Sequence, residues 1–173
     1  RLAAAIYTVL IPERTALTER FAAAHPEIRL HLENPTQVRQ FIGLRRGEID
    51  IAIVIGLAAR SAETAGPETD ALSEIVFPGD FERLDITARP VRLLVPRESP
   101  LAALDPIPLD RLAGTRVAML GAYHGAELID AISLPLLEAG VDLDVPAEGN
   151  AISVERHGVL ARLPAVSLGW FSY

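Results

Sequence analysis

The fold of this chain is decided by the stretch Gly47-Glu48-Ile49-Asp50-Ile51-Ala52-Ile53-Val54-Ile55. Residues 49–55 are apolar except for Asp50, and a short apolar run of this kind is typical of a strand buried on both faces of a parallel sheet. Gly47 stands where a preceding helix would end, because glycine readily adopts the left-handed conformation that follows many helices. The stretch therefore predicts the end of a helix followed by a central parallel strand.

The residues before this strand show the same alternation of strand and helix. Residues 2–7 form a short apolar run, and residues 28–32 alternate apolar with polar side chains, as half-buried strands do. We predict helices over 12–25 and 36–46, the second with Thr36 as its N-cap. The resulting order, strand-helix-strand-helix-strand, predicts an α/β sheet with right-handed crossovers.

The first of these helices has a clear end and a predicted apolar face. The pair His25-Pro26 ends the helix, because the residue before a proline disfavours the helical conformation. Leu10, Leu17 and Phe21 recur near the helical period. We therefore predict that these three side chains form the buried face of the helix.

The second half of the chain contains a smaller set of strands and helices. We predict strands over 91–95, 117–120 and 141–145, and helices over 125–139 and 151–157. Pro135 predicts a kink or a break in the longer helix, because proline removes a backbone donor. Between the two halves, residues 57–85 are rich in Ala, Gly, Pro, Thr and acids, which predicts a loop with at most a short strand.

Composition limits the kind of domain and its partners. The chain has 173 residues, of which 50% are hydrophobic, and this suffices for one domain or two small lobes. Its formal net charge is −7 and all 16 basic residues are arginine, so the domain is not expected to read DNA itself. The absence of cysteine excludes disulfides and thiolate metal sites. No apolar run reaches the roughly 18 residues of a membrane span, no signal peptide is recognisable, and we expect a cytoplasmic location.

Signatures of catalysis and of cofactor binding are missing from the sequence. It contains no G-x-S-x-G elbow, no P-loop, no G-x-G-x-x-G and no H-E-x-x-H. The four histidines are scattered and form no metal-ligand pattern. Glu127 and Asp130 are three residues apart, which is ordinary spacing on a solvated helix face. We therefore predict no enzymatic activity, no catalytic residue, no metal and no cofactor.

Three stretches carry a further signal through their order and spacing. They are Phe21-Ala22-Ala23-Ala24-His25-Pro26, Leu44-Arg45-Arg46-Gly47-Glu48-Ile49-Asp50-Ile51-Ala52-Ile53, and Leu93-Leu94-Val95-Pro96-Arg97-Glu98-Ser99-Pro100-Leu101-Ala102. Together the three stretches resemble the effector-binding domain of LysR-type transcriptional regulators. Ser99 departs from the family, which commonly has histidine there. The loop at 57–85 is also longer, and the C-terminal tail shorter, than the family leads us to expect.

The resemblance implies the type 2 periplasmic-binding-protein fold, an α/β architecture of two lobes of β-α-β type with a ligand cleft between them. The first lobe would span residues 1–89 and the second residues 90–148, with hinge strands near 89–91 and near 148–150. Residues 149–173 would return to the first lobe as a short segment.

In such a fold the ligand lies where strands end and helices begin. Free backbone N–H groups and the positive end of the helix dipole favour an anion at these points. Thr8, Thr36 and residues 121–125 match family positions that line the effector cleft. We therefore predict that a small organic anion is bound by a group of residues that follow the strands: Tyr7, Thr8, Thr36, Gln37, Ile55, Gly121, Tyr123, His124 and Gly125.

Four of these residues also have a purely structural interpretation, which the sequence leaves open. Thr36 could serve only as an N-cap, and Thr8 could belong to a structural turn. Tyr123 and His124, flanked by glycines, could form a solvated turn instead of a ligand clamp.

The resemblance implies a sensor in which a small effector shifts the closure of the lobes and so alters the arrangement of subunits. The chain begins without Met, and DNA would be bound only through a winged helix that precedes it in the intact protein. No membrane partner is expected, and the domain would form a homodimer or homotetramer. Two alternatives stay open: a periplasmic solute-binding receptor of a transporter and, with less support, an enzyme on the same scaffold. The sequence identifies neither the effector nor the direction of regulation.

Overall fold

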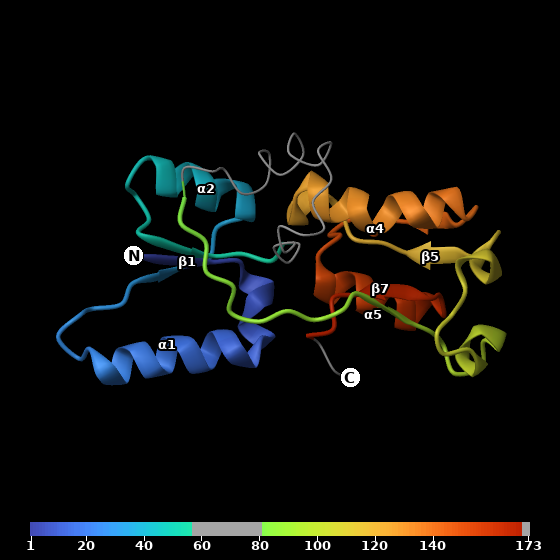
Figure 1. Ribbon diagram of the computed structural model, residues 1–173, viewed down its shortest axis with the longest axis horizontal. Coiled ribbons are helices and arrows are strands. Elements are labelled where there is room, and N and C mark those ends of the chain that lie inside the picture. Colours follow the sequence, from blue (N-terminus) through green and yellow to red (C-terminus); the bar gives the residue numbers. More distant parts are fainter. Residues whose placement is uncertain (57–80, 171–173) are drawn as a thin grey trace, which may run out of the picture. The chain divides into compact units, whose positions relative to one another are not determined.

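The computed structural model describes residues 1–56 and 81–170, except for the side chains of Val38, Tyr123 and Glu127. The chain divides into two compact units (Figure 1). The first unit comprises residues 1–55 and 85–88, and the described residues of the second are 56, 81–84 and 89–170. Most of the predicted loop at 57–85 lies outside the described residues.

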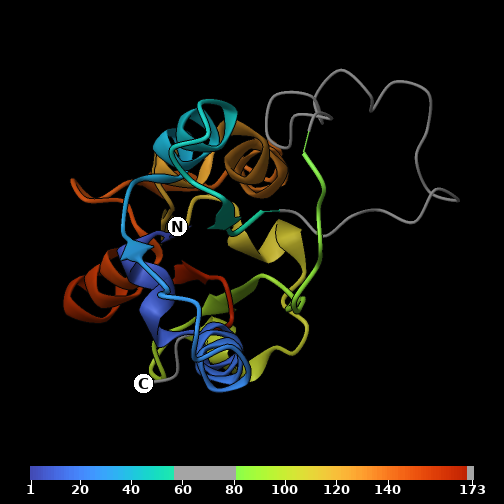
Figure 2. The same cartoon turned by 90° about the vertical axis from the view of Figure 1, so that its left-hand side faces the viewer.

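The first unit is a three-stranded parallel sheet with the strand order β2-β1-β3. Its helices α1 and α2 lie on opposite faces of that sheet, as Figure 1 shows from the side and Figure 2 shows with α1 and α2 almost end-on. The elements of this unit are β1 (Leu2–Ala4), the 3-10 helix η1 (Ile6–Leu10), α1 (Pro12–Ala24), β2 (Leu32–Glu33), α2 (Gln37–Arg45) and β3 (Ile51–Ile53). The predicted alternation of strand and helix is therefore confirmed.

The middle strand of this sheet is β1, not the isoleucine-rich β3 that the sequence favoured as central. All three residues of β1 are buried, whereas Ile51 in β3 is exposed. The reason is topological: β1 pairs with both β2 and β3, and the described residues provide no further strand beside β3. Leu2, Ala4 and Ile53 form a buried core cluster against which Leu30 packs.

The second unit contains a four-stranded sheet with the order β4-β7-β5-β6, in which only β4 is antiparallel to its neighbour. Its elements are β4 (Arg92–Leu94), η2 (Pro100–Ala103), η3 (Leu109–Leu112), β5 (Arg116–Ala118), η4 (Ala122–His124), α4 (Ala126–Glu138), β6 (Asp142–Asp144), α5 (Ala151–Ala161) and β7 (Ala165–Ser167). Helix α5 packs closely on β7, because a Cβ added to Gly158 would lie 2.5 Å from the Cβ of Ala165.

Three details of this unit differ from the sequence-based expectation. Of the kink or break predicted at Pro135, the break does not occur: helix α4 continues through it, and the carbonyl of Pro135 accepts a hydrogen bond from the backbone N–H of Ala139. Helix α5 extends to Ala161, beyond the predicted end at His157. The expected return of residues 149–173 to the first lobe is not seen for residues 149–170, because β7 pairs with β4 and β5 in the second sheet.

Candidate functional site

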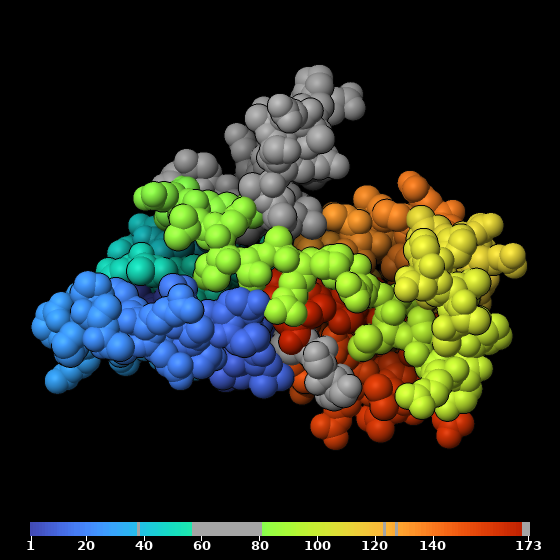
Figure 3. Space-filling view, turned by 60° about the horizontal axis from the view of Figure 1, so that its bottom comes forward, coloured from blue at the N-terminus to red at the C-terminus, as the bar shows by residue number. Residues whose placement is uncertain are grey.

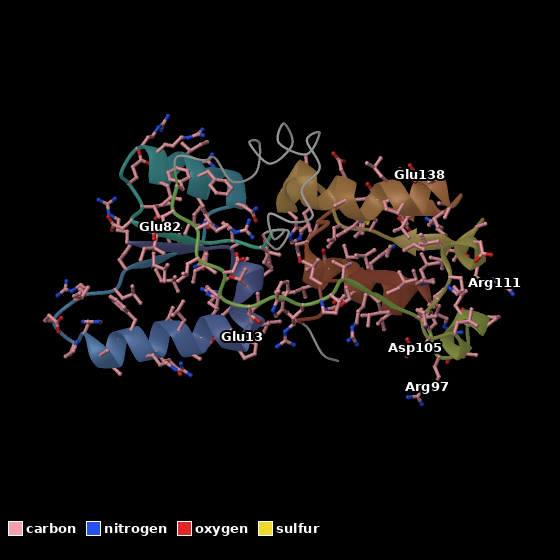
Figure 4. The ribbon with its side chains drawn as sticks, viewed as in Figure 1. Glu13, Glu82, Arg97, Asp105, Arg111 and Glu138 are labelled. Atoms are coloured by element: carbon pink, nitrogen blue, oxygen red, sulfur yellow. The ribbon has the colours of Figure 1, made fainter. Side chains whose placement is uncertain are left out.

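Polar groups gather where the strands of the first unit end. The three strands are parallel, so their carboxyl ends lie at one edge of the sheet. The turn η1 follows β1, and helices α1 and α2 both begin at this edge. Figure 4 shows Glu13 at the beginning of α1. We call this the first strand-end edge, and it contains Tyr7, Thr8, Arg14, Thr36 and Gln37.

Thr8 occupies the centre of a short hydrogen-bonded chain within this edge. Its side chain is fully buried. The Thr8 hydroxyl donates to the backbone carbonyl of Ala5 at 2.6 Å and accepts from Nη1 of Arg14 at 3.0 Å. Because a hydroxyl has a single proton, Thr8 cannot also donate to a ligand in this arrangement. Thr8 therefore holds Arg14 in place.

Arg14 is a buried cation in the first turn of α1. Its exposed fraction is only 5%, and burial lowers the pKa of its guanidinium. The hydrogen bond to Thr8 uses one of the five N–H donors of the guanidinium. Within the described part of the chain Arg14 forms no ion pair, so the charge lacks a carboxylate counterion there.

The start of α2 presents uncapped backbone donors. Thr36 is the N-cap, as predicted, but its exposed side chain accepts no capping hydrogen bond. Gln37 is the first residue of the helix and is only 3% exposed, yet its Oε1 has no hydrogen-bond partner among the described residues. Gln40 is also buried, and its Nε2 donates to the carbonyl of Pro35 at 3.2 Å.

Tyr7 and Ile55 lie at the same edge and are both buried. Tyr7 belongs to η1, and burial raises the pKa of its phenol to about 12, so the phenol stays protonated at neutral pH. Ile55 follows β3 and supplies an apolar surface. The structure thus brings the five residues predicted from this half of the chain to one edge of one sheet.

The second unit has a corresponding edge, where β5 and β6 end. The backbone N–H of Gly121, after β5, donates to the carbonyl of Gly149, after β6, at 2.7 Å. A Cβ on Gly149 would lie 2.8 Å from the Cα of Gly121, so the two segments approach as closely as only glycines allow. The Asn150 side chain then caps α5 by accepting from the N–H groups of Ile152 and Ser153. We call this the second strand-end edge.

The predicted turn at 121–125 forms η4 and the start of α4 at this second edge. His124 is fully buried, and burial lowers its pKa to about 4, so the imidazole is neutral at physiological pH. Gly125 has φ 86°, a conformation that favours glycine, and it precedes α4. The side chain of Tyr123 lies outside the described residues. A neutral His124 contributes no positive charge to anion binding.

Two buried ionisable side chains are absent from the sequence-based prediction. Arg14 was missed because Leu17 and Phe21 were placed on the buried face of the helix. Leu17 is instead 44% exposed on α1, whose outer surface is drawn in blue in Figure 3. The sequence did contain an indication, because an arginine in the first turn of a helix is repelled by the positive end of the helix dipole. Such a residue is expected to have a function that offsets this cost.

The other missed group is Glu155 on α5. It is fully buried, and burial raises the pKa of its carboxyl above the usual 4.5, while the hydroxyl of Ser167 lowers that pKa by a smaller amount. Sequence alone gave no signal for this residue, because an acid inside an amphipathic helix normally faces solvent.

A separate hollow lies at the opposite end of the second unit. It has a volume of about 450 Å³. Arg111, which precedes β5, lies at this end of the unit (Figure 4). None of the predicted site residues borders this hollow, whose lining comprises Pro96, Glu98, Ser99, Pro100, Leu101, Arg111, Thr115, Arg162 and Pro164.

Residues 1–56 and 81–170 contain neither a cluster of metal ligands nor a membrane-spanning helix. No group of three histidine, aspartate or glutamate side chains in this part of the chain is placed to hold a metal ion. No helix in it has both the length and the apolar character needed to cross a bilayer.

Comparison with known proteins identifies the family. The profile of the LysR substrate binding domain matches residues 15–163. Among solved structures, the regulatory domain of CcmR from Synechocystis PCC6803, determined in complex with 2-PG, is similar with a TM-score of 0.67 and 20% sequence identity. The match covers 98% of this chain and 72% of the CcmR chain, and likeness at this identity concerns the fold. No curated protein matches the sequence. The α/β fold of the type 2 periplasmic-binding-protein class is thereby confirmed, and the chain belongs to the LysR substrate-binding domain family.

Proposed function

We propose that this ligand-sensing regulatory domain binds a small organic anion at the first strand-end edge, and that binding changes how the intact regulator acts on DNA. Membership of the LysR substrate-binding domain family supports the sensing role. The anionic character of the effector is supported by the edge itself, where two helices begin and a buried arginine lies. Helix N-termini attract anions because their first N–H groups lack intrahelical partners.

The observation that carries this proposal is the state of Thr36. It occupies the N-cap of α2, but its hydroxyl is exposed and makes no capping bond. In the described residues that hydroxyl has no other hydrogen bond either, and it therefore remains available to a ligand. A threonine that served only as a cap would use its side chain on the N–H groups of the first turn.

The second strand-end edge, with Gly121, His124 and Gly125, is proposed as a further contact surface for the same class of ligand. Helix α4 begins at this edge after Gly125, which is partly exposed, and the first backbone N–H groups of a helix lack intrahelical partners. We further propose that the intact protein binds DNA through a winged helix outside this chain and forms a homodimer or homotetramer. A transporter receptor and an enzyme are not favoured, because the family is one of regulatory domains.

The test is a thermal-shift panel of small carboxylates, phosphates and neutral metabolites on the intact protein, followed by calorimetry of each hit. We expect Thr36→Ala to weaken binding of a hit while leaving the melting temperature of the free protein nearly unchanged, because the hydroxyl makes no bond in the described structure. Loss of one hydrogen bond to a charged ligand corresponds to roughly a tenfold weaker affinity.

Thr15→Ala is the matched control, because Thr15 is an exposed threonine on α1. Thr36→Ser should retain binding, since it keeps the hydroxyl. If Thr36→Ala and Thr15→Ala bind every hit equally well, the proposed position of the effector is wrong. If no member of the panel stabilises the protein, the sensing of a small metabolite is wrong as well.

A further inference from the structure

Arg14 carries a charge that the described structure does not neutralise. Other arginines show the usual solution: Nη2 of Arg116 lies 3.0 Å from a carboxylate oxygen of Asp144, at the surface of the second unit. Arg14 is far more buried, yet its single hydrogen bond goes to the neutral hydroxyl of Thr8. A buried charge without a partner is costly, because water no longer solvates it fully.

The helix that carries Arg14 adds to this cost. Arg14 lies in the first turn of α1, where the helix dipole has its positive end and disfavours a second positive charge. The hydrogen bond of Arg14 goes to Thr8 and not to Glu13, its neighbour in sequence. The inner face of the helix includes Ile11, Arg14 and Phe21. Arg14 therefore occupies a position on this face at which an apolar side chain could pack. The cation is therefore unfavourable for stability, and this points to a role in binding.

We infer that Arg14 binds the oxyanion head group of the effector, a carboxylate or a phosphate, and that Thr8 positions its guanidinium for this purpose. This inference rests on the proposed function and specifies the ligand at the same edge. The guanidinium is planar and offers a fork of parallel N–H donors that matches two oxygens of a carboxylate or phosphate. Thr8 accepts from Nη1 and fixes the orientation of the plane. The Thr8 hydroxyl donates its own proton to the carbonyl of Ala5. Because Thr8 occupies only one N–H donor of Arg14, the other donors of the guanidinium are left for the ligand.

This arrangement makes the site selective for charge. A neutral amide of the same shape as a carboxylate replaces one acceptor oxygen with an N–H₂ donor, and that donor would face the donors of the guanidinium. A buried and unneutralised cation also gains more from an anion than an exposed arginine does, because the local dielectric is lower. The effector is therefore expected to carry a full negative charge at neutral pH.

The experiment compares matched pairs of probes on the intact protein at constant ionic strength. Acetate and benzoate are tested against acetamide and benzamide, and methyl phosphate separates phosphates from carboxylates. Wild type is compared with Arg14→Met, which removes the charge at similar length, and with Arg20→Met. Arg20 is exposed on the same helix and is the control. Thermal shift and calorimetry give the response, and circular dichroism verifies folding.

We expect at least one anionic probe to stabilise wild type and Arg20→Met, while its amide does not. Arg14→Met should bind that anion at least about tenfold more weakly, the range for loss of a charged hydrogen-bonding partner. Arg14→Lys retains the charge without the planar fork and should bind with intermediate affinity, so it serves as the second variant if Arg14→Met does not fold. If the protein is stabilised by the carboxylates and not by methyl phosphate, the head group of the effector is a carboxylate. The opposite result identifies a phosphate.

The inference is overturned if Arg14→Met keeps the anion response of wild type, or if no anionic probe stabilises wild type. It is also overturned if a neutral metabolite binds with an affinity that depends on Thr36 and not on Arg14. In that last case the proposed sensing function survives, and only the charge of the effector has been assigned wrongly.

Discussion

Replacing Gly149 by alanine tests how the second strand-end edge is built. Gly149 has φ 53°, in the left-handed region, and an added Cβ would lie 2.8 Å from the Cα and 2.9 Å from the backbone nitrogen of Gly121. The Gly121 segment cannot move away easily, because its N–H donates to the Gly149 carbonyl at 2.7 Å. Alanine therefore meets two separate penalties at this position, one in the backbone and one in packing.

The expected loss of unfolding free energy follows from adding these penalties. A left-handed conformation costs a residue with a Cβ roughly 1 kcal/mol. Inserting a methyl group into a site without space costs a further 1–3 kcal/mol or so. We therefore expect Gly149→Ala to lower the unfolding free energy by about 3 kcal/mol. With a urea dependence of roughly 2 kcal/mol per molar, the urea midpoint falls by about 1.5 M.

The control is Gly114→Ala in the same unit. Gly114 has φ 69°, but nothing lies within 4 Å of an added Cβ. This variant should therefore show the backbone penalty alone, about 1 kcal/mol. Urea unfolding of both variants, monitored by circular dichroism, isolates the packing contribution as their difference. Equal losses for Gly149→Ala and Gly114→Ala would refute the close approach of the two segments at this edge.

Two other predictions concern the same edge. The pKa of His124 is lowered from 6.5 to about 4 by burial, so its contribution to stability is complete above pH 6.5 and is lost as the pH falls towards 4. The loss amounts to about 3 kcal/mol at 1.36 kcal/mol per pH unit. The difference in unfolding free energy between wild type and His124→Gln, measured by urea titration across this range, should change with pH; a constant difference would contradict the buried neutral state. Asn150→Ala should destabilise the protein by about 1 kcal/mol, because the cap on the N–H groups of Ile152 and Ser153 is lost. Asn150→Asp keeps the acceptor and should cost less; equal losses for the two would argue against the cap.

Local signals in the sequence predicted the elements that form this fold. Pro12 and His25 mark the first and last turns of α1, and Gly47 follows α2 with φ 67°. Asn150 is of a residue type favoured at N-caps, and its side chain accepts hydrogen bonds from the N–H groups of Ile152 and Ser153. These features depend on backbone geometry within a few residues, and they are therefore readable from short stretches.

Predictions that depended on the environment of a side chain succeeded less often. The periodicity of α1 placed Leu17 inside, but the helix turns Arg14 inward and leaves Leu17 exposed. Thr8 stays a predicted ligand contact, and only the structure shows that its hydroxyl accepts a hydrogen bond from Arg14. A helical period of 3.6 residues gives several faces of similar apolar content in a short amphipathic helix, and packing chooses among them.

The sequence alone determined the α/β class, the order of most elements and the family, because turn residues, caps and motif spacing act over short distances along the chain. Only the tertiary structure decided that β1 is the middle strand, that residues 149–170 join the second unit and that Arg14 is a buried cation beside Thr8. Strand order, burial and the pairing of distant polar groups arise from contacts between residues far apart in sequence. The interactions that determine these features therefore cannot be read from any single stretch of the chain, whose local propensities are overridden by tertiary context.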